Sequence, residues 1–226
     1  MIVRKFKDII RKFGIDVIRF PGETLKGRIS LLREHSINLL FDVGANEGQY
    51  AQLMRTLGFT GRIVSFEPLS SAFGLLASHA QADKNWQAVQ MAIGDYDGEV
   101  EINIAANSQS SSILAMLPSH VQAAPDSSYI GKEKVPIARI DSIARQYYRE
   151  GDNLFLKVDT QGFERKVIEG AIATLELIRG IQLEMSLVAL YQGEDTFMDM
   201  IAWLQHKGYE LHSLEPGFRD PASGRL

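Results

Sequence analysis

Residues 38–48 read NLLFDVGANEG, an apolar run that ends in an acid and a glycine turn. The run NLLFDV, residues 38–43, does not alternate between apolar and polar positions, which is typical of a strand covered on both faces. Gly44 and Gly48 allow a tight turn and let a ligand approach the backbone closely. Their spacing is not GxGxxG, so the fingerprint of dinucleotide-binding proteins is absent.

Short apolar strands and helical segments continue to alternate beyond this turn. Further strands are predicted over residues 62–66, 86–93, 153–158, 180–185 and 209–214, with an extra alternating strand over 99–105 and a short extended piece at 135–137. Helices are predicted over residues 23–35, 47–57, 70–81, 141–148, 163–177 and 195–207. Such alternation implies a mostly parallel sheet with helices on both faces, hence a doubly wound, Rossmann-like α/β domain. Residues 107–130, rich in Ser, Ala and Pro, are predicted to form a long loop with short helical pieces, a kind of segment that often acts as a lid.

Composition narrows the class of protein. Of the 226 residues, 45% are hydrophobic and 23% are charged, which is ordinary for a globular protein and excludes a disordered chain. No cysteine is present, so disulfides, thiolate metal sites and a cysteine nucleophile are excluded. No apolar run approaches the roughly 20 residues of a membrane-spanning helix. We expect a cytoplasmic protein.

The N-terminus differs in charge from the rest of the chain. Residues 1–34 hold nine Lys or Arg against four acids, whereas the remaining 192 residues hold 15 basic and 24 acidic residues. A net-acidic body is not typical of a nucleic-acid binder, and we expect no nucleic-acid partner. Residues 1–20 read as a basic amphipathic helix, broken at Pro21 and Gly22. We favour a helix that packs on the main domain over one that lies on a membrane surface.

Acidic residues gather at the ends of predicted strands, where ligands bind in open α/β sheets. Asp42 and Glu47 flank the glycine turn, so a pyrophosphate is disfavoured and a cationic ligand such as S-adenosylmethionine is favoured. Glu67 lies 25 residues after Asp42, near the offset of about 20 at which an acid binds ribose hydroxyls. Asp95 either accepts a hydrogen bond from an adenine amino group or stabilises a turn, and the two interpretations are compatible.

Asp159 and Glu184 end the strands predicted over residues 153–158 and 180–185. Charged residues rarely fill a core, so both are candidates for a substrate-facing acid or base. The alternatives are a helix cap for Asp159 and a structural ion pair for Glu184, with Lys157 as its partner. His120 in the long loop could reach the site, although a solvated loop histidine is the interpretation that we favour. No two histidines are spaced HxxxH, and we predict no metal site.

Six segments, taken in order, resemble the FkbM family of S-adenosylmethionine-dependent methyltransferases. They are FDVGANEGQY (41–50), FEP (66–68), AIGDYDGE (92–99), VPIARIDSI (135–143), LKVDTQGFERKVIEGA (156–171) and IQLEM (181–185). The resemblance covers residues 38–214 and implies a class I methyltransferase fold with strand order 3-2-1-4-5-7-6 and strand seven antiparallel.

The resemblance also implies roles for individual residues. Asp42, Gly44, Asn46 and Gly48 would hold the methionine end of S-adenosylmethionine. Glu67 would bind the ribose, and Gly94 with Asp95 would border the adenine. Asn107, Ser108 and the following serines match a polar segment near the acceptor side.

On this basis we divide the chain into an N-terminal helical segment, residues 1–36, and a methyltransferase domain, residues 37–226. One departure from the family concerns the last strand. After Glu215 the chain reaches DPASGRL (220–226), a turn that almost no strand follows. We therefore expect either a sequence that ends early or a homodimer that covers the unpaired edge of the sixth strand.

The expected activity is O-methyl transfer to a hydroxyl of a sugar, glycan or polyketide-type small molecule. A hydroxyl acceptor must lose its proton, and Asp159, then Glu184, then His120 are the candidates for that role. A nicotinamide-dependent (NAD(P)) oxidoreductase is disfavoured by the acidic loop and the missing fingerprint. A divalent metal held as in catechol-type enzymes is disfavoured because only two carboxylates are in place. A non-catalytic binding module on a methyltransferase fold is the third alternative.

Overall fold

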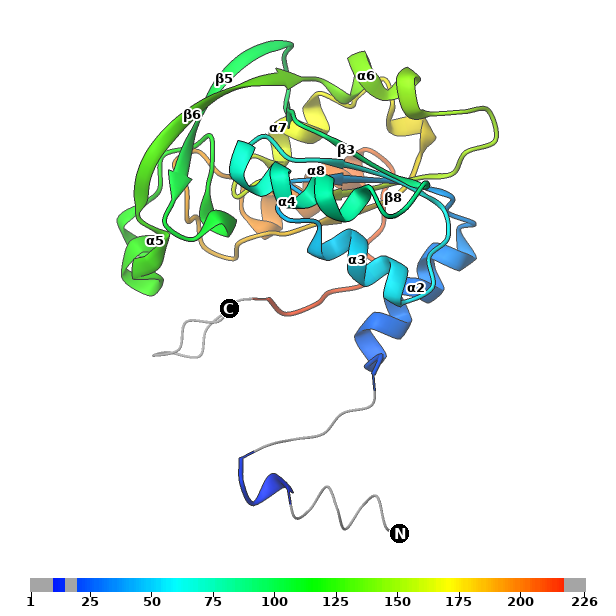
Figure 1. Cartoon of the computed structure of the whole chain (residues 1–226), viewed down its shortest axis with the longest axis horizontal. Coiled ribbons are helices and arrows are strands. Elements are labelled where there is room, and N and C mark those ends of the chain that lie inside the picture. Colours follow the sequence, from blue (N-terminus) through cyan, green and yellow to red (C-terminus); the bar gives the residue numbers. More distant parts are fainter. Residues whose placement is uncertain (1–9, 15–19, 218–226) are drawn as a thin grey trace.

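The computed structural model describes residues 10–14 and 20–217, and its centre is a five-stranded parallel sheet (Figure 1). The strand order is β3-β2-β1-β7-β8, and every neighbouring pair is parallel. The strands are β1 (Leu39–Val43), β2 (Arg62–Phe66), β3 (Trp86–Val89), β7 (Leu154–Val158) and β8 (Ile178–Leu183). The parallel sheet, flanked by helices, confirms the predicted Rossmann-like α/β fold.

Helices cover both faces of the sheet because β1, β2 and β7 bury apolar side chains on both sides. One face packs against α2 (Glu23–Glu34), α3 (Gln49–Thr56) and α4 (Ser70–Ala80). The other packs against α6 (Ile140–Tyr147), α7 (Glu164–Glu169) and α8 (Phe197–His206). Figure 1 shows α2 and α3 on the opposite side of the sheet from α6 and α7.

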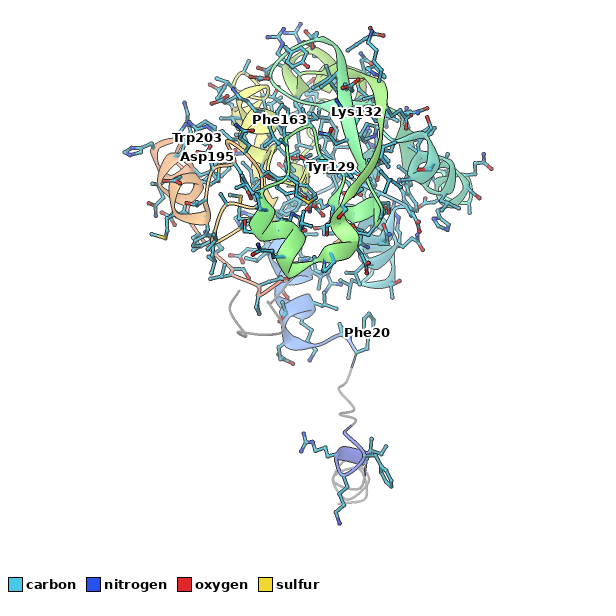
Figure 2. The ribbon with its side chains drawn as sticks, turned by 90° about the vertical axis from the view of Figure 1, so that its left-hand side faces the viewer. Phe20, Tyr129, Lys132, Phe163, Asp195 and Trp203 are labelled. Carbon is cyan, nitrogen blue, oxygen red and sulfur yellow. The ribbon has the colours of Figure 1, made fainter. Side chains whose placement is uncertain are left out.

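A cluster of stacked and ion-paired side chains joins α7 to α8, which lie on the same face of the sheet. The Arg165 guanidinium lies 3.8 Å from the centre of the Trp203 ring and 3.5 Å from a carboxylate oxygen of Asp195. Figure 2 shows Trp203 and Asp195 together on one side of the molecule. Stacking and ion pairing at one arginine hold the short helix α7 against its longer neighbour.

A smaller sheet lies beside the first, with order β4-β6-β5. It contains β4 (Ala92–Ile93), β5 (Gly98–Ala105) and β6 (Tyr129–Ala138), and β5 pairs with β6 as an antiparallel ribbon (Figure 1). The prediction of one strand over residues 86–93 is wrong, because the chain leaves the main sheet after Val89. Val89 pairs with Phe66, the last residue of β2, and its carbonyl accepts from the backbone N–H of Glu67. The next N–H on that side, that of Leu69, donates to the Glu67 carboxylate, so the ladder goes no further.

Two further predictions of element length are corrected. The extended piece at 135–137 is the end of the ten-residue strand β6, whose exposed first half is charged and contains Gly131. The helix predicted over 163–177 ends at Glu169, because Gly170 packs against the backbone of Gly94, and a 3₁₀ turn follows at Leu175–Leu177. Asp141 holds that connection through the backbone N–H groups of Ala173 and Thr174.

The sixth strand predicted over residues 209–214 does not form. Residues 210–214 are exposed and make no ladder, although their alternating sequence suits a strand. Within the described part of the chain the outermost strand on this side is β8, so the strand order ends at the fifth position and the open edge belongs to β8. Pairing of a second copy at that edge stays a prediction.

Residues 107–130 form the predicted loop with short helical pieces, namely η1 (Ser108–Ser110), α5 (Pro118–Ala123) and η2 (Pro125–Ser127). Backbone hydrogen bonds tie this loop to the segment after β8: Leu117 N donates to Leu190 O, and Gln192 N donates to Ala115 O. The loop is thus pinned across the carboxyl ends of β7 and β8.

The helix predicted over residues 1–20 lies largely outside the described residues. Within residues 10–14 a helical stretch at positions 10–11 gives way to a turn at Gly14. In the described ranges, no helix is both long and apolar enough to span a bilayer.

Candidate active site

A cavity of about 450 Å³ lies at the carboxyl ends of β1, β2, β7 and β8, the position at which open α/β sheets bind ligands. Gly44, Asn46, Glu67, Asp159 and Glu184 line it, and these are five of the predicted site residues. The same wall includes Ser108, Gln109, Ser111 and Ser112, which belong to the polar segment expected on the acceptor side. The cavity volume falls in the range of about 300–1,000 Å³ that is usual for small-molecule sites.

The turn after β1 forms the floor of the cavity. Gly44 has φ +71°, and a Cβ placed on it would lie 1.7 Å from the carbonyl oxygen of Asp159. Asn46 also lies in the left-handed region, with φ +48°, and its side chain donates to Ser108 Oγ at 3.1 Å. The turn therefore brings bare backbone to the cavity, and glycine is required because the neighbouring strand end lies so close.

Glu67 follows β2 and is 5% exposed. Its carboxylate accepts from the backbone N–H of Asn46 at 2.8 Å and from that of Leu69 at 2.9 Å. Burial raises the pKa of Glu67 to about 7, although the two N–H groups act in the opposite direction. Each carboxylate oxygen retains a lone pair, so Glu67 can still accept a hydrogen bond from a ligand in the cavity.

A buried polar row runs beneath the floor, across the middle of the sheet. The parallel register places Asp42 between Ser65 and Lys157. Lys157 Nζ lies 3.1 Å from Asp42 Oδ1 and donates to Gly44 O at 3.1 Å, and Ser65 Oγ donates to Asp42 Oδ2 at 3.1 Å. Burial opposes the charge of Lys157, but Asp42 and Asp159 outweigh it and raise the lysine pKa. Asp42 is 0% exposed and lies below the cavity lining, so its observed contacts are with Lys157 and Ser65.

Asp159 and Glu184 lie side by side at the ends of β7 and β8. Lys157 Nζ is 3.6 Å from Asp159 Oδ2, and Gln161 Nε2 donates to Asp159 Oδ1 at 2.9 Å. The charge of Asp159, and after it burial, raise the pKa of Glu184 to about 7. Near neutral pH Glu184 therefore gains or loses its proton readily, which suits proton transfer.

The other predicted residues lie away from the cavity lining. Asp95 pairs with Lys166 on α7 at 3.0 Å, because the strand that was expected to carry it to the cavity ends at Val89. A Cβ at Gly94 would lie 2.7 Å from Ile137, and one at Gly48 would lie 2.8 Å from Trp86, so both glycines allow close packing of neighbouring elements.

His120 is buried rather than solvated. It is 8% exposed, its ring packs edge-to-face on Tyr191 at 5.1 Å, and burial lowers its pKa. Its Nδ1 has no hydrogen-bond partner among the described residues. The histidine thus packs inside the loop, and the structure does not bring it to the cavity.

Sequence reasoning missed several residues that line the cavity. Lys157, Gln182 and Tyr50 form one wall, where the Tyr50 hydroxyl donates to Gln182 Oε1 at 2.8 Å. The sequence suggests Lys157 only as an ion-pair partner for Glu184, and its place beside Asp42 depends on the strand register. Tyr50 and Gln182 carry no such signal, because each is an ordinary position on a helix or an outer strand.

Comparison with known families agrees with this geometry. The family described as "Methyltransferase FkbM domain" matches residues 42–211, more than half of the chain. The chain belongs to the FkbM methyltransferase family. The matched range begins at the buried Asp42 and includes Ser108, Lys157 and Glu184, which line the cavity. A search of the curated proteins gives no match to this chain.

Membership of the FkbM family makes this chain a methyltransferase and confirms the resemblance drawn from its six segments. No three carboxylate or imidazole groups converge as a metal site within residues 10–14 and 20–217. The groups at the cavity that could serve chemistry are thus the carboxyl pair Asp159–Glu184, the ammonium of Lys157 and the carboxyl of Glu67.

Proposed function

We propose that this FkbM-family chain transfers the methyl group of S-adenosylmethionine to a hydroxyl of a sugar, glycan or polyketide-type small molecule. The observation that carries the proposal is the placement of acids along one cavity: Glu67 at the end of β2, and the pair Asp159–Glu184 at the ends of β7 and β8. One acid suits a nucleoside ribose, and the pair suits an acceptor that must lose a proton.

The residues present fit S-adenosylmethionine. The floor at Gly44 and Asn46 offers backbone groups without side-chain obstruction. Glu67 would accept from the ribose hydroxyls, and the acids around Lys157 would compensate a positive ligand charge. When bound, the cofactor supplies an electrophilic methyl group on a sulfonium. Asp95, held by Lys166, would border the adenine only if that ion pair opens.

The carboxyl pair would act on the acceptor. Asp159 would accept a hydrogen bond from the acceptor hydroxyl, fix its direction and take its proton. Glu184, next to it, would share that proton because its pKa is about 7. The serines of residues 107–130 that reach the cavity supply neutral donors and acceptors suited to a polyhydroxylated acceptor.

Calorimetric titration with S-adenosylhomocysteine tests the cofactor part of the proposal. We expect saturable binding to the wild type and a loss of at least about tenfold in Glu67→Ala, because a hydrogen bond to a charged group contributes about 1.5–3 kcal/mol. Glu133→Ala is the matched control, since that exposed carboxylate accepts from Ser70 away from the cavity. Binding of NADH without S-adenosylhomocysteine would overturn the proposal in favour of an oxidoreductase.

Turnover with a panel of hydroxyl compounds tests the second part. We expect release of S-adenosylhomocysteine with at least one sugar or polyketide, and a loss of about 10²–10⁴ in kcat for Asp159→Asn. Cofactor binding without turnover of any acceptor in the panel would favour the non-catalytic binding module.

A further inference from the structure

Gln161 is a non-glycine residue with a left-handed backbone, held by contacts on every polar group of its side chain. Its φ is +56°. Its Nε2 donates to Asp159 Oδ1 at 2.9 Å, and its Oε1 accepts from the Tyr191 hydroxyl at 3.0 Å. Its backbone carbonyl accepts from Ser112 Oγ at 2.7 Å. A conformation that costs about 1–3 kcal/mol persists only where its surroundings fix it, and such sites cluster at functional positions.

The direction of the Gln161 amide is determined by its two neighbours. Tyr191 is 1% exposed, and burial raises its pKa, so its hydroxyl keeps its proton and donates. A carboxylate only accepts hydrogen bonds, so the Gln161 NH₂ group faces Asp159 and the Gln161 oxygen faces Tyr191. A reversed amide would place its oxygen against the carboxylate and lose the hydrogen bond to Asp159.

Tyr191 is itself held by the loop of residues 107–130. Its hydroxyl also lies 3.2 Å from Ser110 O, and its backbone pairs with Met116 in an antiparallel bridge. A Cβ on Gly162 would lie 3.0 Å from the Tyr191 side chain, so the ring packs directly on the turn after Asp159. A continuous chain of contacts thus runs from the loop through Tyr191 and Gln161 to Asp159.

Charged groups surround Asp159 on its other sides. Lys157 lies 3.6 Å away, Glu184 is its neighbour on β8, and Glu164 is tied into the same turn by the backbone N–H of Thr160 at 2.8 Å. These charges set the energy of the Asp159 carboxylate but leave its rotation open, because an ion pair at this distance has little directional preference. The Gln161 amide is a directional donor at 2.9 Å and fixes which oxygen is left for a ligand.

We propose that Gln161 and Tyr191 are positioning residues, which orient the Asp159 carboxyl towards the acceptor and link that orientation to the packing of residues 107–130. The inference rests on the proposed function for the role of Asp159. The hydrogen-bond chain itself can be tested without the acceptor or the cofactor.

The test measures titration of side-chain carboxyl ¹³C resonances in the full chain, for the wild type and three variants. Tyr191→Phe keeps the ring and its packing but removes the donor. Gln161→Asn keeps an amide that tolerates the left-handed backbone but is one methylene too short to reach both partners. Tyr209→Phe is the matched control, because the Tyr209 hydroxyl also lies within hydrogen-bond distance of two oxygens, the carbonyls of Leu175 and Ile178, at 3.1 Å each.

We expect the titration of the Asp159–Glu184 pair to move upwards by about half a unit or more in both variants. Gln161→Asn removes the donor to Asp159, and Tyr191→Phe removes the contact that holds this donor in place. The double variant should show the shift of one single variant, since both break the same chain. Tyr209→Phe should lower the melting temperature by a similar amount without moving the titration.

Two results would overturn the inference. The first is a wild-type titration of the pair in a folded Tyr191→Phe protein, and the second is an equal shift in Tyr209→Phe. Calorimetry with S-adenosylhomocysteine on the same samples separates this inference from the proposed function. If the two variants shift as expected but the wild type does not bind the nucleoside, the proposed function is refuted and the positioning chain stands.

Discussion

The seam between β1 and β7 and the outer edge of β8 lie in the same sheet but are built in opposite ways. In the seam, every strand residue has neighbours on both sides, and the charges of Asp42 and Lys157 are buried against each other. The strand β8 has β7 as its only strand neighbour among the described residues. A groove of about 1620 Å³ is lined by residues of β8, α2 and α8 and by residues 208–217.

The difference shows where this FkbM-family domain fixes its structure. At the seam the backbone, the charges and the cavity floor depend on one another, so a small change should have a large effect. At the β8 edge the side chains reach water, as Leu211 at 52% exposure and Leu214 at 68% do, so changes should have small effects. The following predictions test that contrast from the largest effect to the smallest.

Gly44→Ala should be the most damaging substitution in the seam. The new Cβ would lie 1.7 Å from the backbone oxygen of Asp159, and the residue has φ +71°, so the two strand ends must separate. We expect a loss of more than about 4 kcal/mol in urea unfolding, or failure to fold. Gly27→Ala in α2 is the control, since nothing lies within 4 Å of its Cβ, and it should stabilise by up to about 1 kcal/mol. A soluble Gly44→Ala protein of wild-type stability would contradict the inference that the cavity floor requires glycine at this position.

Lys157→Met should cost about 3–5 kcal/mol, because it leaves the carboxylate of Asp42 buried without its cation. Adding Asp42→Leu should recover most of that loss, since a buried pair can be replaced by apolar side chains with little cost. Urea unfolding of the two single variants and the double variant gives the coupling. Purely additive losses would show that the pair does not act as a unit.

Glu67 should make cofactor affinity depend on pH. With a pKa of about 7, Glu67 loses most of its charge between pH 8 and pH 6, so affinity for S-adenosylhomocysteine should fall by about tenfold over that range. Glu67→Gln should bind weakly and remove this pH dependence. An unchanged slope in that variant would assign the dependence to Glu164 or Glu184, whose pKa values are also about 7.

The same shift has a definite sign for stability. Because the pKa of Glu67 is raised in the folded protein, its contribution to stability is complete below about pH 4.5 and is lost as pH rises through about 7. The free energy of unfolding of Glu67→Gln should therefore vary less than that of the wild type between pH 5 and pH 7, as urea unfolding at a series of pH values would measure.

Leu214→Ser should have the smallest effect, within about 0.5 kcal/mol, because the side chain is largely in water. Light scattering should be measured on the same samples. A loss above about 1 kcal/mol that grows with protein concentration would show that the β8 edge is covered by a second copy, as first expected for the sixth strand, and the contrast between the two regions would then apply to the monomer alone.

Much of the seam could be predicted from the residues alone. The apolar runs predicted β1, β2 and β7 within a residue or two, and the acids that follow them marked the side of the sheet that holds the cavity. Local sequence suffices there for two reasons. Strands buried on both faces have a distinctive composition, and the turns that follow them need backbone conformations that glycine adopts readily.

The outer elements could not be predicted in this way. Residues 86–93 look like one strand, but a strand extends only as far as its neighbour can pair, and β2 ends at Phe66. Residues 209–214 have the right alternation but no adjacent strand among the described residues. The sequence suggests an adenine contact or a turn for Asp95 and favours a solvated loop position for His120, whereas Asp95 pairs with Lys166 and His120 is buried against Tyr191.

The sequence by itself thus determined the fold class, the family and the sheet edge that carries the cavity, because these follow from local composition and short motifs. Only the tertiary structure decided which residues share a wall. Lys157 meets Asp42 through strand register, and Gln161 meets Tyr191 through the packing of a distant loop. Such contacts join residues far apart in the chain, and their geometry is set by the packing of the whole domain rather than by any local preference.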